Sequence, residues 1–144
     1  MADRNKWWLI LAVLVLSLDA AAQRGQVVAV DPWIREAPPG MHMWAGFVTL
    51  RNTSHEAVAL TGAESEQFAL VEMHRSFIDN GVARMRQQSR IEILPGQQLP
   101  LEPGGYHLML MHAREPVRAG KTFMLTLQFD NGQSLRLPFV VRKP

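Results

Sequence analysis

The feature that most constrains the fold of this chain is a series of short apolar alternations divided by turn residues. None of these segments keeps a helical periodicity over three turns. Clusters of Pro, Gly and Asn, such as Pro103-Gly104-Gly105, separate them. The segments are Val27 to Ile34, Trp44 to Asn52, Ala57 to Gly62, Phe68 to Ile78, Val82 to Gln87, Tyr106 to His112, Thr122 to Phe129 and Ser134 to Val141. The pattern predicts an all-β fold, an antiparallel Greek-key sandwich or barrel.

Two Asn-Gly pairs, at residues 80–81 and 131–132, are the sharpest local signals. A two-residue type I′ turn needs positive φ at both positions, which Asn-Gly tolerates best, so each pair predicts a hairpin. Counting outward from residues 80–81 places Ser76 opposite Met85. His74 and Met85 then become diagonal neighbours on one face, with Cβ atoms about 7–8 Å apart.

The segment that begins at Tyr106 carries a second pair of candidate ligands. Side chains alternate between the two faces of a strand, so His107, Met109 and Met111 are expected on one face, opposite Leu108 and Leu110. The sequence therefore predicts a site where two strand pieces meet, the hairpin that carries His74 and Met85 and the segment that carries His107 and Met109.

The four side chains His74, Met85, His107 and Met109 are spaced as H-(x)10-M-(x)21-H-x-M. Thioether sulfur is soft and uncharged, so it suits Cu(I) and offers little to Zn²⁺, Mg²⁺ or Ca²⁺. The sequence contains no cysteine, which removes the thiolate that a blue-copper electron-transfer centre needs. The donor types therefore predict a Cu(I) site.

The first residues have the pattern of a secretory signal. Arg4 and Lys6 precede an apolar stretch from Trp7 to Leu18, and residues 20–22 form an A-x-A cleavage site. We expect a signal peptide at 1–22 and one β-domain at 23–144, although an uncleaved anchor stays open. No cysteine is available for a lipid anchor.

The formal net charge of +2, without a basic block, gives no support for nucleic-acid binding.

These residues resemble the PCu(A)C family of periplasmic copper chaperones. The resemblance rests on the four-residue spacing, on residues 103–111 (PGGYHLMLM), and on Trp33-Ile34-Arg35. It implies a cupredoxin-like β-domain that binds Cu(I) at the four positions. It further implies a periplasmic carrier, not an enzyme, that delivers copper to the CuA centre of cytochrome c oxidase subunit II, directly or with a Sco-type protein.

Three residues depart from the family pattern in the loop before Trp44. Met41, His42 and Met43 stand where relatives usually carry small or aliphatic residues, and His112 stands where glycine is common. Met41, His42 and Met43 either form an auxiliary copper site or pack as an exposed loop. Together with Met111, which shares the face of Met109, these residues leave the number of copper ions open.

Other residues near the motif have simpler readings. Met73 alternates away from His74, so it is expected in the core. Trp44 either shields the metal or belongs to the core. The triplet at residues 52–54, Asn-Thr-Ser, fits a glycosylation sequon, but we interpret it as a turn because the resemblance is to bacterial proteins.

The leading functional hypothesis is a monomeric carrier that passes Cu(I) on by ligand exchange. A copper-dependent redox or electron-transfer protein is the first alternative, and it would need a site stable in both Cu(I) and Cu(II). The second alternative is a structural β-sandwich in which the His and Met residues are incidental. No Ser-His-Asp order, HExxH helix or close carboxylate pair indicates an enzyme.

Overall fold

The computed structural model describes residues 26–144, which form ten β-strands and contain no helix that could cross a membrane. The expected signal peptide at residues 1–22 lies outside the described residues. The strands are β1 (Val27–Arg35), β2 (Met43–Asn52), β3 (Val58–Glu64), β4 (Phe68–Asp79), β5 (Val82–Gln88), β6 (Ile91–Ile93), β7 (Gln98–Leu101), β8 (Tyr106–Ala113), β9 (Thr122–Phe129) and β10 (Ser134–Arg142). All eight predicted segments are strands, with ends that differ by no more than two residues.

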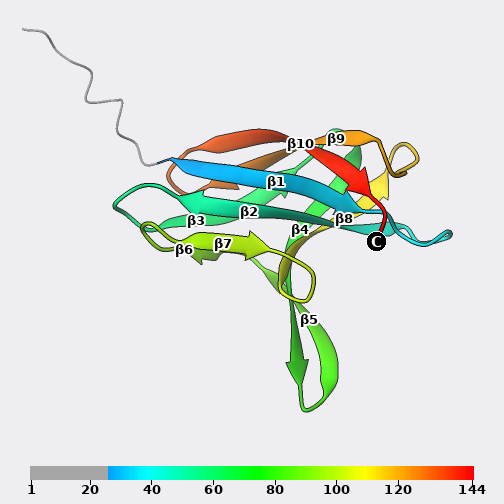
Figure 1. The fold of residues 1–144 in the computed structure, drawn as a ribbon, viewed down its shortest axis with the longest axis horizontal. Coiled ribbons are helices and arrows are strands. Elements are labelled where there is room, and N and C mark those ends of the chain that lie inside the picture. The colour runs from blue at the N-terminus through cyan, green and yellow to red at the C-terminus, as the bar shows by residue number, and fades with distance from the viewer. Residues whose placement is uncertain (1–25) are drawn as a thin grey trace, which may run out of the picture.

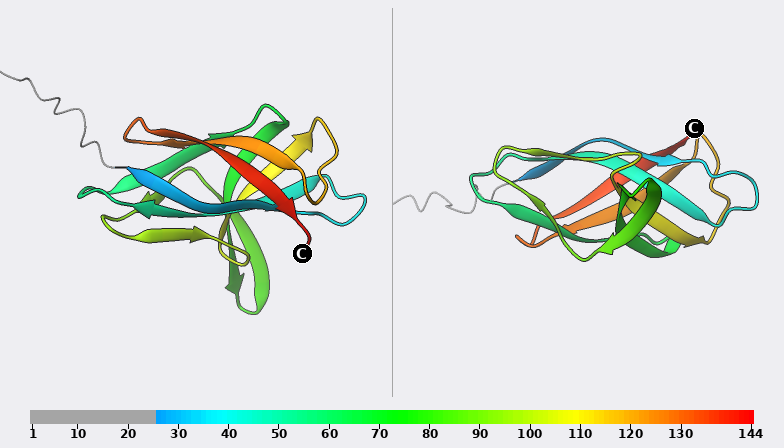
Figure 2. Two further views of the ribbon diagram at one scale, coloured as in Figure 1. Left: turned by 45° about the horizontal axis from the view of Figure 1, so that its top comes forward. Right: turned by 90° about the horizontal axis from the view of Figure 1, so that it is seen from below.

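The strands form one sheet in the order β5-β4-β8-β7-β2-β1-β10-β9-β3-β6, and β8 also pairs directly with β2. Most neighbours are antiparallel, but β1 pairs with β10 and β7 pairs with β8 in parallel. Figures 1 and 2 show that the sheet twists and folds over, so that its strands lie in two layers. The predicted all-β sandwich is confirmed, with the difference that its sheet is mixed.

The core lies between the two layers. Phe68 of β4 contacts Phe123 of β9, with ring centroids 5.2 Å apart, although these strands are not neighbours in the sheet. Leu108 and Leu110 of β8 belong to the same buried cluster and have no exposed surface. Because side chains alternate along a strand, residues 107, 109 and 111 are turned to the outer face of β8, as predicted.

Two short strands, β6 and β7, were not predicted. β6 has only three residues, too few to show an alternation, and it pairs with β3. β7 contains Pro100, a residue that argues against a strand when only the sequence is read. In the structure β7 pairs with the end of β2, where Pro100 lies opposite Thr49.

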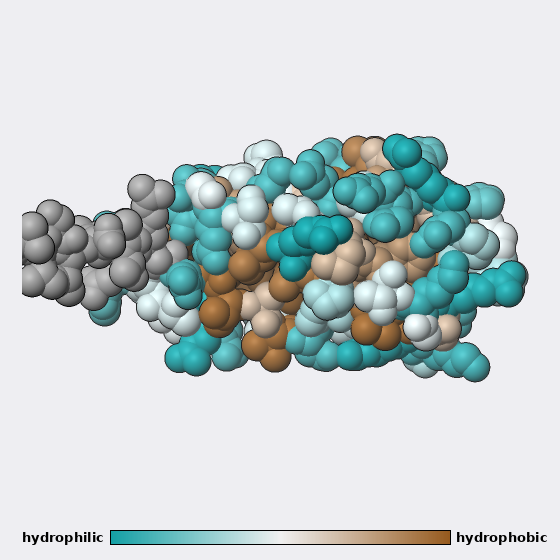
Figure 3. Space-filling model, turned by 90° about the horizontal axis from the view of Figure 1, so that it is seen from above, coloured by the Kyte–Doolittle hydropathy of each residue, from teal (hydrophilic) through white to brown (hydrophobic). Residues whose placement is uncertain are grey.

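The β4–β5 hairpin projects from the body of the sandwich (Figure 1). Nearly all of β5 is exposed to solvent, including the apolar side chains of Val82 and Met85. The view from above, opposite the side from which the hairpin projects, shows a largely hydrophilic surface with an apolar area toward one end (Figure 3). Met85 is therefore exposed on the projecting hairpin, away from the body of the sandwich.

Asn52, at the end of β2, is completely buried and organises the loop that follows it. Its Nδ2 donates to the carbonyl oxygens of Glu56 at 2.7 Å and Ile93 at 3.0 Å. Its Oδ1 accepts hydrogen bonds from the backbone N–H and the hydroxyl of Ser54. The interpretation of residues 52–54 as a turn is confirmed, and the amide of Asn52 is fully used inside the fold.

Candidate metal centre

β4 and β5 pair in the register that the turn predicts. Asn80 and Gly81 have φ values of 48° and 78°, the positive values that this turn requires. Ser76 lies opposite Met85. His74, two residues before Ser76 on the same face, is a diagonal neighbour of Met85. The predicted relation between these two candidate ligands is confirmed.

β8 lies on the other side of β4 and brings a second histidine directly opposite the first. His74 pairs with His107, and their ring centroids are 5.8 Å apart with the ring planes inclined by 36°. This separation leaves room for one ion between the two rings, at a bond length of about 2 Å to a nitrogen of each. The structure therefore makes His74 and His107 the centre of the candidate site.

The two methionines lie one step along the strands on either side of this histidine pair. Met109 follows His107 on the same face of β8 and lies opposite Glu72 of β4. Met85 stands on the projecting hairpin and is 51% exposed, whereas His107 is only 4% exposed. The site thus has a buried imidazole at its base and an accessible thioether at its edge. A role of these four residues as metal ligands stays a prediction.

His107 is held in one orientation by the backbone. Its Nδ1–H donates to the carbonyl oxygen of Gly105 at 3.1 Å, and the same oxygen accepts the backbone N–H of Ser76. Since a carbonyl can only accept, Nδ1 carries the proton and the lone pair is on Nε2. Burial lowers the pKa of His107, the hydrogen bond to Gly105 opposes that shift, and the charge of His74 adds to it. The neutral imidazole that a metal needs is therefore favoured.

His74 is oriented by a carboxylate that the sequence reading missed. Its Nε2–H donates to Oε2 of Glu72 at 2.8 Å, so in the neutral ring the lone pair is on Nδ1. That Nδ1 is buried and has no hydrogen-bond partner. A buried acceptor without a partner costs about 1–3 kcal/mol, and a bound cation would satisfy it. The period-two rule places Glu72 on the face of His74, and this signal could have identified it.

The donors at this site are two neutral imidazole nitrogens and two thioether sulfurs. Neither donor type carries charge, and thioethers favour soft ions such as Cu(I). The carboxylate of Glu72 acts through His74, in the way that outer partners orient metal-binding histidines. The donor set fits a soft monovalent ion and lacks the thiolates or oxygens that structural zinc and calcium sites use.

The aromatic neighbour of the site is Phe47, not Trp44. Phe47 is buried on β2, and its ring centroid lies 6.5 Å from that of His107. Trp44 lies opposite Leu110 and contacts Phe68, so it packs against the core. Of the two readings of Trp44, the core role is confirmed. Phe47 therefore packs beside His107 at the buried base of the site.

The metal-free protein is expected to become less stable as the pH falls below 6.5. The pKa of His107 in the folded protein is lower than its ordinary value of 6.5, chiefly because of burial. Below that pH the unfolded chain binds a proton that the folded chain does not, so the free energy of unfolding decreases. Urea denaturation at about pH 8 and about pH 5.5 measures this loss. His107→Gln, which cannot titrate, should reduce the difference; an equal difference in both proteins would contradict the assignment.

Comparison with protein families identifies relatives over most of the described chain. The family model described as "Putative lipoprotein LpqE-like" matches residues 27–141. The protein Lxx21020 of Leifsonia xyli subsp. xyli (strain CTCB07) is 33% identical over 103 residues, 71% of this chain and 61% of that protein. Protein RP573 of Rickettsia prowazekii (strain Madrid E) is 27% identical over 106 residues, 71% of this chain and 59% of that protein. The alignments thus span about three fifths of each relative.

Solved structures share the fold. The copper-bound PCuAC domain of PmoF2 superposes with a TM-score of 0.70 at 21% identity, covering 83% of this chain and 95% of that domain. The apo PCuAC domain of PmoF1 gives 0.72 at 19% identity, covering 83% and 96%. The Cu(I) form of DR1885 from Deinococcus radiodurans gives 0.59 at 24% identity, covering 88% and 85%. The chain has the fold of a PCuAC domain and belongs to the LpqE-like family.

Proposed function

We propose that this protein is an extracytoplasmic carrier that binds Cu(I) through His74, Met85, His107 and Met109. The observation that carries the proposal is the direct pairing of His74 with His107, with a thioether one step away on each side. Mixed imidazole and thioether ligation favours Cu(I) over harder ions. The copper-bound PmoF2 domain and the Cu(I) form of DR1885, which share the fold, support the choice of metal.

The hydrogen bonds around the two histidines indicate which nitrogens would bind the ion. His107 would use Nε2, because its Nδ1–H is bonded to Gly105. His74 would use Nδ1, because its Nε2–H is bonded to Glu72. Both rings are therefore oriented before the ion arrives, which lowers the ordering cost of binding.

The function that follows is transfer by ligand exchange. Met85 is the most exposed of the four candidate ligands and stands on the projecting hairpin, so it can leave first when an acceptor offers its own sulfur. A charged thiolate of the acceptor would replace a neutral thioether, which favours transfer away from this protein. The ion then moves from one protein to the other without release to water. No covalent bond of a substrate is made or broken, so the protein acts as a carrier.

The acceptor proposed here is the CuA centre of cytochrome c oxidase subunit II, reached directly or through a Sco-type thiol protein, in the periplasm. Support comes from the PCu(A)C resemblance of the four-residue spacing and from the exposed position of Met85. Mixing the Cu(I)-loaded protein with a soluble thiol-containing acceptor domain under anaerobic conditions tests this step. The expected result is complete movement of copper to the acceptor; retention of copper would contradict the proposed direction.

An anaerobic Cu(I) titration with a competing chelator, combined with X-ray absorption, tests the site itself. The expected result is one tight equivalent with both nitrogen and sulfur neighbours. The same measurement on a double variant, His74→Ala with Met109→Ala, should show that this equivalent is lost. Tight binding that persists in the double variant would show that copper binds elsewhere.

Glu72→Gln is expected to weaken Cu(I) binding by about 10–100-fold, the usual effect of removing an outer partner of a metal-binding histidine. The substitution keeps the size of the side chain but removes the charge that orients His74. Chelator competition measures the affinity, and Glu92→Gln, an exposed position on β6, is the matched control. Equal affinities for both variants would show that Glu72 has no part in the site.

A further inference from the structure

A second group of thioethers lies on the same outer face as Met109. β2 runs beside β8, and Met43 lies directly opposite Met111. On the other side of β8, Met111 lies opposite Leu70 of β4. Directly opposed residues have Cβ atoms about 4.5–5.5 Å apart, so the sulfurs of Met43 and Met111 can reach one ion. The sequence alone did not predict this pair because it depends on the register of β2 against β8.

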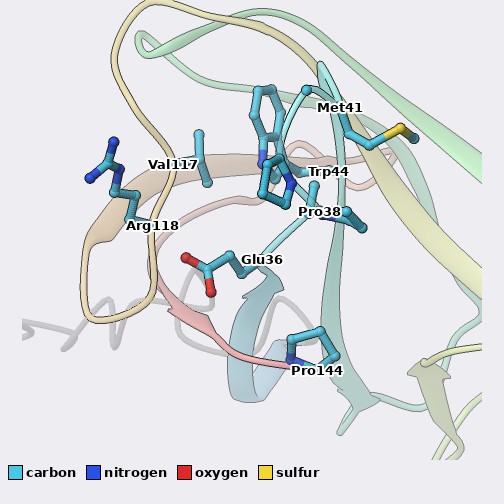
Figure 4. Close-up of a pocket in the computed structure, with 10 residues that line it drawn as sticks. Glu36, Pro38, Met41, Trp44, Val117, Arg118 and Pro144 are labelled. Carbon is cyan, nitrogen blue, oxygen red and sulfur yellow. The ribbon is translucent and has the colours of Figure 1, made fainter.

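Met41 extends this pair. Its backbone N–H donates to the carbonyl oxygen of Pro38 at 3.1 Å, closing a turn in which Gly40 has a φ of 85°. The turn holds Met41 two residues before Met43. Figure 4 shows Met41 at the edge of a cavity of about 570 Å³, with its sulfur directed away from Val117 and Arg118 on the far side. A third thioether thus lies two residues before Met43 in the chain, at the edge of the cavity and with its sulfur turned away from the far side.

Core packing does not account for these methionines. Met41 is 49% exposed and Met43 is 48% exposed, whereas Met73, which does serve the core, is 4% exposed. Leaving two such side chains in water forgoes the burial that stabilises a core methionine by about 1.5–3 kcal/mol. The residues paired across this row, Leu70, Met111 and Met43, are all uncharged. A soft cation would therefore meet sulfur donors without competition from a neighbouring carboxylate in the row.

We propose that Met41, Met43 and Met111 form a second Cu(I) site, separate from the histidine centre. Its donors are three neutral thioethers, a set that suits Cu(I) and few other biological ions. Met111 lies two residues from Met109 along β8, a distance of about 6.6 Å. The second site is thus adjacent to the histidine centre, and copper captured there can pass to Met109 by exchange of one thioether for another. The existence of the site does not depend on the proposed function; only this onward transfer does.

Methionine-methyl NMR and Cu(I) titration of the full chain test the proposal. The protein is labelled with ¹³C at the methionine methyl groups and titrated anaerobically with Cu(I) under chelator competition. We expect two equivalents: the first shifts the methyl signals of Met85 and Met109, and the second shifts those of Met41, Met43 and Met111. A single equivalent, or a second one that leaves these three signals unchanged, would overturn the proposal.

A double variant, Met43→Leu with Met111→Leu, removes the sulfurs and nearly keeps the side-chain volume. We expect loss of the second equivalent, retention of the first, and an unchanged urea midpoint. Met124→Leu, at a half-buried position on β9, is the matched control and should keep both equivalents. Retention of both equivalents in the double variant would overturn the proposal.

His107→Ala separates this proposal from the proposed function. In this variant the second site should still bind one equivalent of Cu(I), with only sulfur neighbours in X-ray absorption. If His107→Ala keeps the tight equivalent while the Met43 and Met111 variant loses the second one, the histidine centre is wrong and the thioether site stands. If His107→Ala binds no copper at all, the thioether site is wrong.

Discussion

His107→Ala is expected to weaken tight Cu(I) binding by at least about 100-fold. Losing a residue that only hydrogen-bonds a metal-binding histidine usually costs about 10–100-fold, and losing the histidine itself should cost more. His107 is the most buried of the four candidate ligands, and the carbonyl of Gly105 fixes its ring. Alanine removes the coordinating nitrogen and leaves no other donor at that position on β8. Chelator competition under anaerobic conditions measures the affinity of the wild-type and variant proteins.

The same measurement should rank the candidate ligands by their burial. Met85→Leu is expected to weaken binding by only about tenfold, because its exposed thioether exchanges easily with water or with an acceptor. Its larger effect should be on the rate of transfer, measured by stopped-flow mixing with the acceptor. His55→Ala, in the exposed loop after Asn52, is the control and should leave both quantities unchanged. If Met85→Leu costs more affinity than His107→Ala, the site is organised around the hairpin and not around the histidine pair.

Asn52→Ala is expected to lower the free energy of unfolding by about 2–4 kcal/mol, as a buried polar group with several partners would. The substitution leaves the carbonyl oxygens of Glu56 and Ile93 and the backbone N–H of Ser54 without their bonds to the amide. These bonds join the end of β2 to the loop and to β6. Urea denaturation with a linear extrapolation measures the loss.

Thr53→Ala, the next residue along the chain, is the matched control for Asn52→Ala. The Thr53 hydroxyl makes an exposed hydrogen bond to the carbonyl oxygen of Gln26, so its loss should cost less than about 1 kcal/mol. Asn52→Ala removes the Asn-x-Ser/Thr pattern and Thr53→Ala keeps it, and only Asn52→Ala removes a buried hydrogen bond. Equal losses of stability would show that the loop conformation, and not the buried amide, matters.

The strands could be predicted because each one carries its own signal. In β8, Leu108 and Leu110 are buried while Met109 between them is turned outward, which is the alternation that the sequence shows. The β4–β5 register could be predicted because Asn80-Gly81 fixes a two-residue turn, and a turn sets the pairing of the strands that it joins. Local chemistry thus fixed half of the candidate site, the diagonal pair His74 and Met85.

The pairings of β8 with β4 and β2, and of β1 with β10, could not be predicted because they join strands far apart in the sequence. β8 lies between β4 and β2, and the parallel contact of β1 with β10 joins the two ends of the described chain. No turn sets these registers; they follow from how the buried faces fit together in the core. The strand β7 also depends on a distant partner. Pro100 argues against a strand in the sequence, and the strand becomes evident only from its pairing with β2, where Pro100 lies opposite Thr49.

The sequence by itself determined the all-β fold, the β4–β5 hairpin and the four donor side chains, because periodicity, turn chemistry and ligand type are properties of a few neighbouring residues. Only the tertiary structure decided that His74 faces His107, that Glu72 orients His74, and that Met43 lies opposite Met111. Each of these relations depends on the register between strands. That register is set by packing the whole core, in which every strand contributes to the position of every other.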